Sequence, residues 1–205
     1  MRTSHPVRRV LAAAVCAAAL SASGQPAPAA RIDVAGIKYE QNINLGGQEL
    51  VLNGAGIRYR AIFKVYTAGL YLGAKANTAE AVLAAPGAKR IHLVMLRAID
   101  ANDFGKILSA GIEKNASRED FIAVLPAIVR MGEASASYKQ LLPGDTLTVD
   151  YVPGTGMSLY VKGKLEAGPY KDPNTFSAMA KIWLGKSPAD YLLKDALLGI
   201  QKAPG

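Results

Sequence analysis

Over much of residues 37–99, apolar and polar positions alternate with a period of two, which is the spacing of half-buried β-strands. β-Branched and aromatic residues, which favour sheets, are frequent in these runs. Asn53 and Gly54 lie between two of the runs and form a dipeptide typical of a tight hairpin turn, so we expect the chain to reverse there. The expected strands cover residues 37–43, 48–52, 59–65, 66–72 and 90–99.

In the middle of the chain the period changes to that of a helix. A helix capped by Asp100 or Asn102 would place four apolar residues on one face: Phe104, Ile107, Leu108 and Ile112. The segment Ser117-Arg-Glu-Asp120 is close to a capping box and predicts a second helix. Pro126 should kink or break that second helix.

The last third of the chain predicts a hairpin and two helices. Residues 146–152 and 157–161 flank Pro153-Gly-Thr-Gly156, which is typical of a β-hairpin. Two helices follow the hairpin, from Asn174 to Gly185 and from Ser187 as N-cap to Gly199, and a short helix is expected earlier in the chain, over residues 78–85. Strands followed by helices, a hairpin and further helices indicate an α+β fold, with a mostly antiparallel β-sheet covered by a layer of helices.

The N-terminal segment differs from the rest. Three arginines precede an apolar run over residues 10–20, and Ala27-Pro-Ala29 then offers a cleavage site. This pattern predicts a secretory signal peptide over residues 1–30, a single domain over residues 31–205, and export to a bacterial periplasm. No later run has enough apolar residues to span a bilayer, so no transmembrane segment is expected after cleavage.

Composition excludes several functional classes. The one cysteine, Cys16, lies in the expected signal peptide, so disulfides and thiolate chemistry are excluded from the mature chain. The formal net charge of +8 falls to +5 without the three N-terminal arginines, and the remaining bases are scattered along the sequence. Nucleic-acid binding would require clustered bases, so we expect no nucleic-acid partner.

Motifs for metals, cofactors and nucleophilic catalysis are incomplete. Gly54-Ala-Gly56 lacks the third glycine and the downstream acid of a dinucleotide site. His92, the one histidine after residue 30, has no Gly-x-Ser-x-Gly nucleophile to serve, which favours a structural or surface role. The acidic pairs resemble helix caps. We therefore expect neither a metal site nor a cofactor.

Arg58 and Arg97 are the cations that suggest binding chemistry. Each lies in or beside an expected strand with apolar neighbours, where a guanidinium needs an anionic or carbonyl partner. That partner could be a ligand carboxylate or phenolate held in bidentate fashion. It could equally be an internal acid, or the side chain could extend to solvent. Arg58 leaves both interpretations open, whereas Arg97 fits a structural role better.

Several segments together resemble the chalcone isomerase-like family, including its exported bacterial members. They are Gly54-Ala-Gly-Ile-Arg58, Lys64-Val-Tyr-Thr-Ala-Gly-Leu-Tyr-Leu72, Gly144-Asp145, Lys181-Ile-Trp-Leu-Gly185 and Leu197-Leu-Gly199. Their order and spacing extend the resemblance over nearly all of residues 35–199. The resemblance implies an open-faced sandwich that holds an apolar or phenolic ligand between the sheet and the helices.

The resemblance also implies a site. In the plant enzymes a phenolate closes onto an enone, and an arginine and a threonine in the stretch K-x-T-A-x-G-x-Y-L hold the substrate. Arg58 is similar to that arginine and Thr67 to that threonine, while the family's tyrosine and asparagine fall on Phe104 and Gly111. Phenylalanine cannot donate a hydrogen bond to a developing enolate, and loss of one such donor typically costs about two to three orders of magnitude in rate.

Other branches of the family bind fatty acids and place the arginine on the carboxylate. The hypothesis is therefore an exported, non-catalytic protein that binds a small amphipathic molecule, fatty-acid-like or phenolic. The candidate ligand-binding residues are Arg58, Thr67, Arg97, Phe104 and Gly111. The alternatives are an intramolecular lyase that uses Arg58 and Thr67, and a structural protein whose cleft is filled by its own side chains. The oligomeric state stays open.

Overall fold

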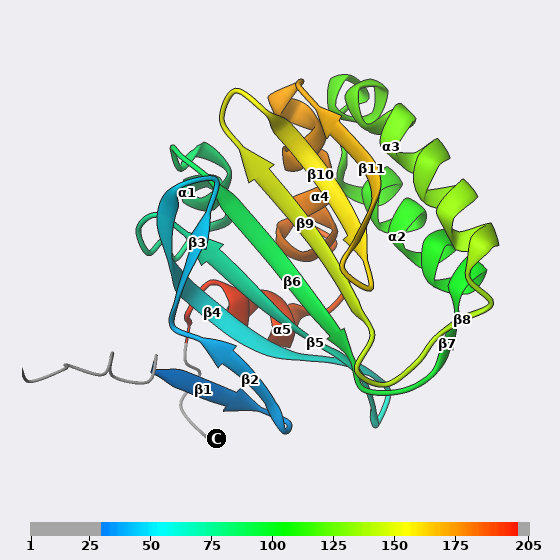
Figure 1. Ribbon diagram of the computed structural model, residues 1–205, viewed down its shortest axis with the longest axis horizontal. Helices are drawn as coiled ribbons and strands as arrows, with labels where there is room; N and C mark the ends of the chain where they lie inside the picture. Colours follow the sequence, from blue (N-terminus) through cyan, green and yellow to red (C-terminus); the bar gives the residue numbers. More distant parts are fainter. Residues whose placement is uncertain (1–29, 201–205) are drawn as a thin grey trace, which may run out of the picture.

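The computed structural model describes residues 30–200, so the predicted signal peptide lies outside the described residues except for Ala30. Seven strands form one antiparallel sheet in the order β11-β10-β9-β6-β5-β4-β3 (Figure 1). Its strands are β3 (Asn42–Leu45), β4 (Gln48–Arg60), β5 (Phe63–Leu72), β6 (Lys89–Met95), β9 (Thr146–Val152), β10 (Gly156–Val161) and β11 (Lys164–Tyr170). Two small two-stranded sheets pair β1 (Arg31–Val34) with β2 (Ile37–Glu40), and β7 (Ile99–Asp100) with β8 (Gln140–Leu141).

Helices cover one face of the large sheet (Figure 1). They are α1 (Ala79–Ala84), α2 (Ala101–Asn115), α3 (Arg118–Ser137), α4 (Pro173–Leu184) and α5 (Tyr191–Leu197). Helix α4 lies behind the centre of the sheet, α2 and α3 pack beside it, and α5 packs against β4. This arrangement confirms the predicted α+β fold with a layer of helices on an antiparallel sheet.

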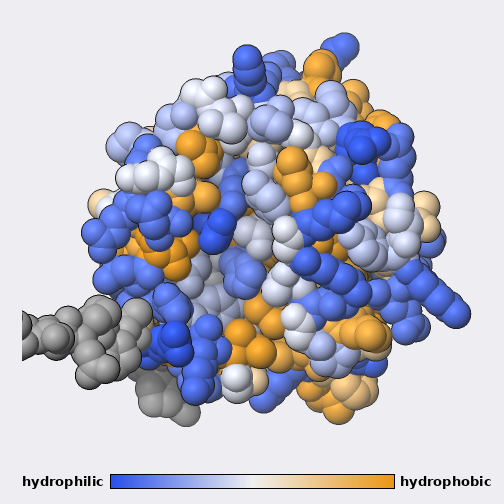
Figure 2. Space-filling view, in the orientation of Figure 1, coloured by the Kyte–Doolittle hydropathy of each residue, from blue (hydrophilic) through white to orange (hydrophobic). Residues whose placement is uncertain are grey.

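The two faces of the sheet are covered in different ways. The helix-covered face holds the main core, in which Trp183 and Leu108 are among the buried side chains. On the other face, the β1–β2 hairpin covers a smaller cluster that contains Tyr39, Leu52 and Tyr71. Figure 2 views this second face and shows a hollowed surface on which hydrophilic side chains predominate beyond the apolar cluster.

The predicted turn at Asn53-Gly54 is wrong, because β4 continues through both residues. Asn53 is buried, and its amide donates to the carbonyl oxygens of Ala76 and Leu197 at 2.8 and 2.7 Å while accepting the N–H of Ala76 at 2.7 Å. Gly54 lies where a Cβ would come within 2.0 Å of the Ala196 carbonyl oxygen of α5. Contacts with α5, and not a turn, therefore explain why an asparagine and a glycine stand at these two positions. The chain instead reverses between Arg60 and Phe63, inside a predicted strand.

Other boundaries are confirmed or shift by a few residues. Asp100 and Ser117 bond the first-turn amides of α2 and α3, as the sequence predicts. Thr78, expected as the first residue of a helix, instead caps α1 from the position before it. Pro126 lies inside α3 without ending it. The predicted hairpin appears as β9 and β10.

The starts of the last two helices and some of the strands were not predicted correctly. Helix α4 is capped by Asp172, not Asn174, and α5 by Asp190, not Ser187. Ser187 instead exchanges two hydrogen bonds with the Asn115 side chain, so the chain is held there before the helix can begin. Strand β11 has no counterpart among the predicted strands, and neither have the short strands β1 and β8.

Candidate ligand cavity

A cavity of about 300 Å³ opens beside the turn of the β4–β5 hairpin, between the sheet and the start of α2. Cationic side chains and apolar side chains line it together. The lining residues are Arg58, Arg60, Phe63, Val65, Tyr66, Arg97, Ala98, Ile99, Asp100, Phe104 and Ile107. A volume of this size, with a few polar groups on apolar walls, is typical of a small-molecule site.

Strand register places Arg58 on the helix-covered face of the sheet. Arg58 is paired with Tyr66 across β4 and β5, so the two side chains share a face. An irregularity in the register follows Arg58 directly, and one guanidinium nitrogen donates to the Tyr59 carbonyl oxygen at 2.8 Å. Within residues 30–200, no acid lies within 4.0 Å to form an ion pair with Arg58. The guanidinium therefore keeps donors available for an anion.

Tyr66 is the polar group that sequence reasoning missed. Its hydroxyl is buried and accepts a hydrogen bond from the Trp183 indole N–H at 2.9 Å. Burial raises the pKa of Tyr66 to about 12, although the Trp183 hydrogen bond and the Arg58 charge act in the opposite direction. The phenol is thus protonated at neutral pH. Because Trp183 occupies an acceptor position, the phenol proton can still be donated to a ligand oxygen.

Arg97 and Phe104 complete the polar and apolar ends of the cavity. The Arg97 guanidinium lies 5.0 Å from the centroid of the Phe63 ring, which is a cation–π distance. The Phe104 ring meets the Tyr66 ring edge to face, with centroids 6.1 Å apart. The structure therefore brings Arg58, Arg97 and Phe104 together around one cavity.

Phe104 also forms the wall of a second, apolar hollow. This hollow holds only about 20 Å³ and lies between α2, α3 and the strands β9 and β10. Its lining includes Leu108, Met131 and Leu159, with no charged residue. Phe104 thus separates the cationic cavity from an apolar space that extends deeper under the helices.

Comparison with known proteins identifies the family. A profile of chalcone isomerase-like proteins matches residues 30–199. The chain belongs to the chalcone isomerase-like family. A solved structure with the same fold is the Arabidopsis thaliana fatty-acid binding protein AtFAP1, which is 15% identical, with a TM-score of 0.58. The alignment covers 80% of this chain and 92% of that one. No curated protein sequence matches the chain.

The position expected for the family threonine requires a correction. Thr67 points to the face opposite Arg58, where it is fully buried and accepts a hydrogen bond from the Tyr39 hydroxyl at 2.8 Å. Neighbouring residues of a strand face opposite sides, so Thr67 cannot share a cavity with Arg58. Counted back from Gly69 and Tyr71, the threonine of K-x-T-A-x-G-x-Y-L falls on Tyr66. This count was the sequence clue that would have identified Tyr66.

Gly111, at the family's asparagine position, also lies outside the cavity. It faces α4, where a Cβ would come within 3.1 Å of the Ile182 Cγ2 atom. A side chain here would press on α4 before it could reach a ligand. Of the two family positions on α2, only Phe104 therefore lines the cavity.

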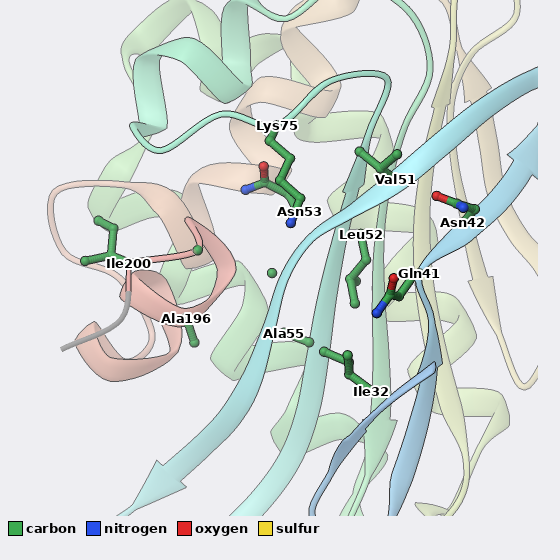
Figure 3. A pocket seen from close by; sticks show the side chains of 12 residues that line it. Ile32, Gln41, Asn42, Val51, Leu52, Asn53, Ala55, Lys75, Ala196 and Ile200 are labelled. Carbon is green, nitrogen blue, oxygen red and sulfur yellow. The ribbon is translucent and has the colours of Figure 1, made fainter. Parts of the chain in front are cut away.

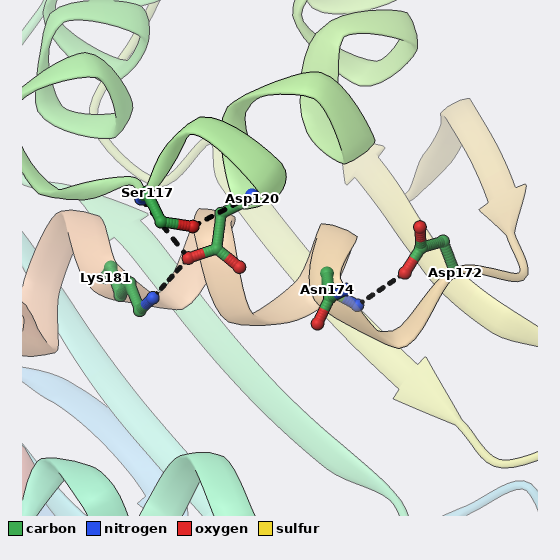
Figure 4. A network of polar contacts seen from close by, with 5 residues as sticks. All are labelled: Ser117, Asp120, Asp172, Asn174 and Lys181. Carbon is green, nitrogen blue, oxygen red and sulfur yellow. Dashed lines mark hydrogen bonds and ion pairs between the residues drawn. The ribbon is translucent and has the colours of Figure 1, made fainter.

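The segment Lys181-Ile-Trp-Leu-Gly185 lies behind the residues that line the site. Trp183 contacts Tyr66, and the Lys181 ammonium pairs with the Asp120 carboxylate of α3, which also caps that helix with Ser117 (Figure 4). Burial opposes ionisation of Asp120, but Lys181 and Ser117 outweigh it and lower its pKa. The ion pair fixes α3 against α4, so this family motif supports the cavity without lining it.

A second cavity, of about 510 Å³, lies near the β1–β2 hairpin and the end of α5 (Figure 3). Its walls include Ile32, Gln41, Val51, Asn53 and Lys75. Lys75 is the one charged residue among its lining residues, and Asn53 already bonds backbone groups. None of the predicted site residues lines it, so its size alone does not make it the stronger candidate.

His92 takes part in a structural contact on the far face. Its Nδ1 lies 2.8 Å from the Thr148 hydroxyl, and its ring meets the edge of Tyr39. Burial, with the nearby Arg90 charge, lowers the pKa of His92. In the described part of the chain no group of three or more possible ligands could hold a metal ion, and no helix is long and apolar enough to cross a membrane.

Proposed function

We propose that this chalcone isomerase-like protein binds an amphipathic carboxylate in the cavity at the β4–β5 turn. The carboxylate accepts hydrogen bonds from the guanidinium groups of Arg58 and Arg97 and from the hydroxyl of Tyr66. The alkyl tail lies against Val65 and Ile99 and extends toward Phe104. One observation carries the proposal: a guanidinium without an ion-pair partner stands at an apolar cavity of ligand size.

The fold adds support of a general kind. AtFAP1, which shares the fold, is described as a fatty-acid binding protein. A carboxylate ligand needs only charge-assisted donors and apolar walls, which this cavity retains. Binding without turnover fits the absence of a donor from both Phe104 and Gly111.

The size of the cavity sets the expected chain length. A volume of about 300 Å³ lies at the lower limit for small-molecule sites, and the Phe104 ring ends it on the apolar side. We expect a saturated acid of medium length to fit better than a long one. Phe104→Leu should open a path into the second hollow and raise the affinity for hexadecanoate relative to decanoate by about fivefold, the worth of one or two buried methylenes.

Displacement of a fluorescent fatty acid by decanoate tests the proposal. Arg58→Ala should weaken decanoate binding by about tenfold or more, the usual worth of a charge-assisted hydrogen bond. Arg118→Ala is the matched control, because it removes one positive charge from an exposed position on α3. Equal affinities of wild type and Arg58→Ala would refute binding at this site, and equal losses in both variants would reduce it to general charge attraction.

Export forms part of the same proposal. The N-terminal segment would direct the chain to the periplasm and be removed near residue 30. Mass spectrometry of the protein from a cell-envelope fraction should find a chain that begins close to that residue. Recovery of the uncleaved chain from the cytosol alone would refute export.

A lyase remains the alternative, favoured by one observation. Tyr66 places a protonated phenol beside Arg58, so a donor for an enolate oxygen is present despite Phe104. Ultraviolet assay of flavanone formation from a chalcone tests this function, with Tyr66→Phe as the variant. A rate equal to the spontaneous background would eliminate the lyase, whereas a rate that Tyr66→Phe abolishes would support it.

A further inference from the structure

Exposed apolar side chains gather at the turn of the β4–β5 hairpin. We name residues 59–64 the hairpin tip. Within it, Ile62 is 85% exposed, Phe63 56% and Tyr59 36%. Figure 2 shows apolar atoms at the lower right end of the molecule, where Figure 1 places this turn, bordered by hydrophilic atoms. Apolar exposure concentrated on one protruding turn indicates a surface that another body covers.

Positive charge surrounds the hairpin tip. Arg60 and Lys64 belong to it, and Arg58 and Arg97 stand beside it. In the part of the chain that the structure describes, none of these four cations has an acid within 4.0 Å. Arg58, Arg60 and Lys64 are close together in the sequence, and the fold brings Arg97 to them from the loop after β6.

Two acids beside the tip, Asp100 and Asp190, accept hydrogen bonds from backbone groups. Asp100 accepts the N–H of Asp103 at 3.0 Å as the cap of α2. Asp190 accepts the N–H of Leu192 at 2.8 Å as the cap of α5, and its other oxygen accepts the N–H of Tyr59 at 2.9 Å. Within residues 30–200 neither acid forms an ion pair with these cations, and the four cations outnumber the two acids, so the surface can attract an external anion.

We propose that the hairpin tip docks on the surface of a bilayer that contains anionic phospholipid. Ile62 and Phe63 would enter the boundary between headgroups and acyl chains, while Arg60 and Lys64 meet the lipid phosphates. Arg97, stacked on Phe63, can hold its charge at the level of the headgroups while its stem covers apolar surface. The cavity mouth then faces the bilayer. Docking rests on this surface alone and does not require that the cavity binds a ligand.

The shape of the tip favours a fluid partner. A narrow protruding turn buries its apolar area only where the surrounding medium can close around it, as lipid does, whereas a folded partner would need a matching socket. The apolar stripe of α3, formed by Ile122, Leu125 and Val129, is also exposed but lies on a helix whose Arg130 is paired with Glu133. That stripe therefore serves as a control surface.

A site-specific fluorophore tests the docking on the full chain. Cys16→Ser removes the one native cysteine, and Ala61→Cys then accepts an environment-sensitive dye at the tip. The control carries the dye at Val129→Cys. Vesicles of phosphatidylcholine, with and without about a third of phosphatidylglycerol, are added at low and high salt.

We expect a blue shift of the emission at position 61 with anionic vesicles, no shift at position 129, and loss of the shift at high salt. Lys64→Glu changes the charge by two units and should weaken partitioning by about 25-fold, since each unit charge near such a surface is worth about fivefold. Ile62→Ser should weaken it as well. Neither residue lines the cavity, so decanoate binding in solution should not change, and failure of docking can be told from failure of ligand binding.

Four results would overturn the proposal. The first is a dye at position 61 that stays in a water-like environment with anionic vesicles. The second is an equal shift at positions 61 and 129, and the third is an equal shift with neutral vesicles. The fourth is a shift produced as strongly by soluble polyglutamate, which would identify an acidic polypeptide as the partner instead.

Discussion

The β4–β5 hairpin contains two regions with opposite character. Residues 53–56 pack so closely on α5 that Gly54 and Gly56 have no room for a side chain, and every polar atom of the Asn53 amide is bonded. Residues 58–66, at the other end of the hairpin, line part of a cavity, and within residues 30–200 their cations have no ion-pair partner. The same pair of strands thus holds the fold together at one point and leaves binding groups unsatisfied at the next. Substitutions should separate the two roles.

The largest effect is expected at Gly54. In Gly54→Ala the new Cβ would lie 2.0 Å from the Ala196 carbonyl oxygen and 2.9 Å from that of Leu197, both of them backbone atoms. Helix α5 would have to move away from β4, so the free energy of unfolding should fall by about 3 kcal/mol or more. Urea denaturation measures this change. Gly73→Ala is the control, because no atom lies within 4 Å of its Cβ position, and an equal loss there would contradict the argument.

Asn53→Ala comes next in size. The substitution removes three hydrogen bonds and leaves the Ala76 N–H and the Leu197 carbonyl oxygen without this partner. We expect a loss of about 2–3 kcal/mol in the free energy of unfolding, with the affinity for decanoate unchanged in the folded protein. A loss below about 0.5 kcal/mol would contradict this, because it would show that water reaches the backbone groups of Ala76 and Leu197 in place of the amide.

Tyr66→Phe should affect both stability and ligand affinity, since the Tyr66 hydroxyl bonds Trp183 in the core and Tyr66 lines the cavity. Loss of the hydroxyl leaves the Trp183 N–H unpaired, which should lower the free energy of unfolding by about 1 kcal/mol. It also removes one donor to the ligand, so decanoate affinity should fall by roughly fivefold to tenfold. Thr67→Val, which alters the opposite face, should leave the affinity unchanged. If Thr67→Val weakened decanoate binding and Tyr66→Phe did not, Thr67 would be the ligand-binding residue after all.

The smallest expected effect is that of pH on binding. Because the pKa of Tyr66 is raised to about 12, its phenol stays protonated between pH 6 and 9, and arginine keeps its charge. Decanoate affinity, measured by displacement, should therefore be constant over that interval. Stability behaves differently: unfolded tyrosine ionises near pH 10, so the contribution of Tyr66 to stability declines as the pH rises from about 10 toward 12. A binding midpoint between pH 7 and 9 would contradict this account of the donor.

The sequence predicted features that depend on local chemistry. Caps at Asp100 and Ser117 were predicted because a hydroxyl or carboxylate bonds the amides of its own helix turn. Arg58 was predicted as a candidate because a cation among apolar strand residues needs a partner. Neither inference requires knowledge of distant parts of the chain.

Features set by distant contacts were missed. The Asn53-Gly54 turn was predicted because its local preference is strong, yet α5, more than 130 residues later, determines the backbone there. Thr67 was chosen because it is the threonine in the segment that resembles the family. A shift of one residue along a strand reverses the face, and the pairing of Arg58 with Tyr66 places Tyr66 in the cavity instead. The cationic surroundings of the tip likewise need the loop after β6.

The most direct test of the central claim is isotope-filtered NMR of the protein with bound decanoate. The account predicts nuclear Overhauser contacts from the methylenes next to the carboxylate to the methyl groups of Val65 and Ile99, and from the tail to the Phe104 ring. Contacts to the methyl groups of Ile32 and Val51, in the larger second cavity, would contradict it, as would the absence of any contact at saturating ligand.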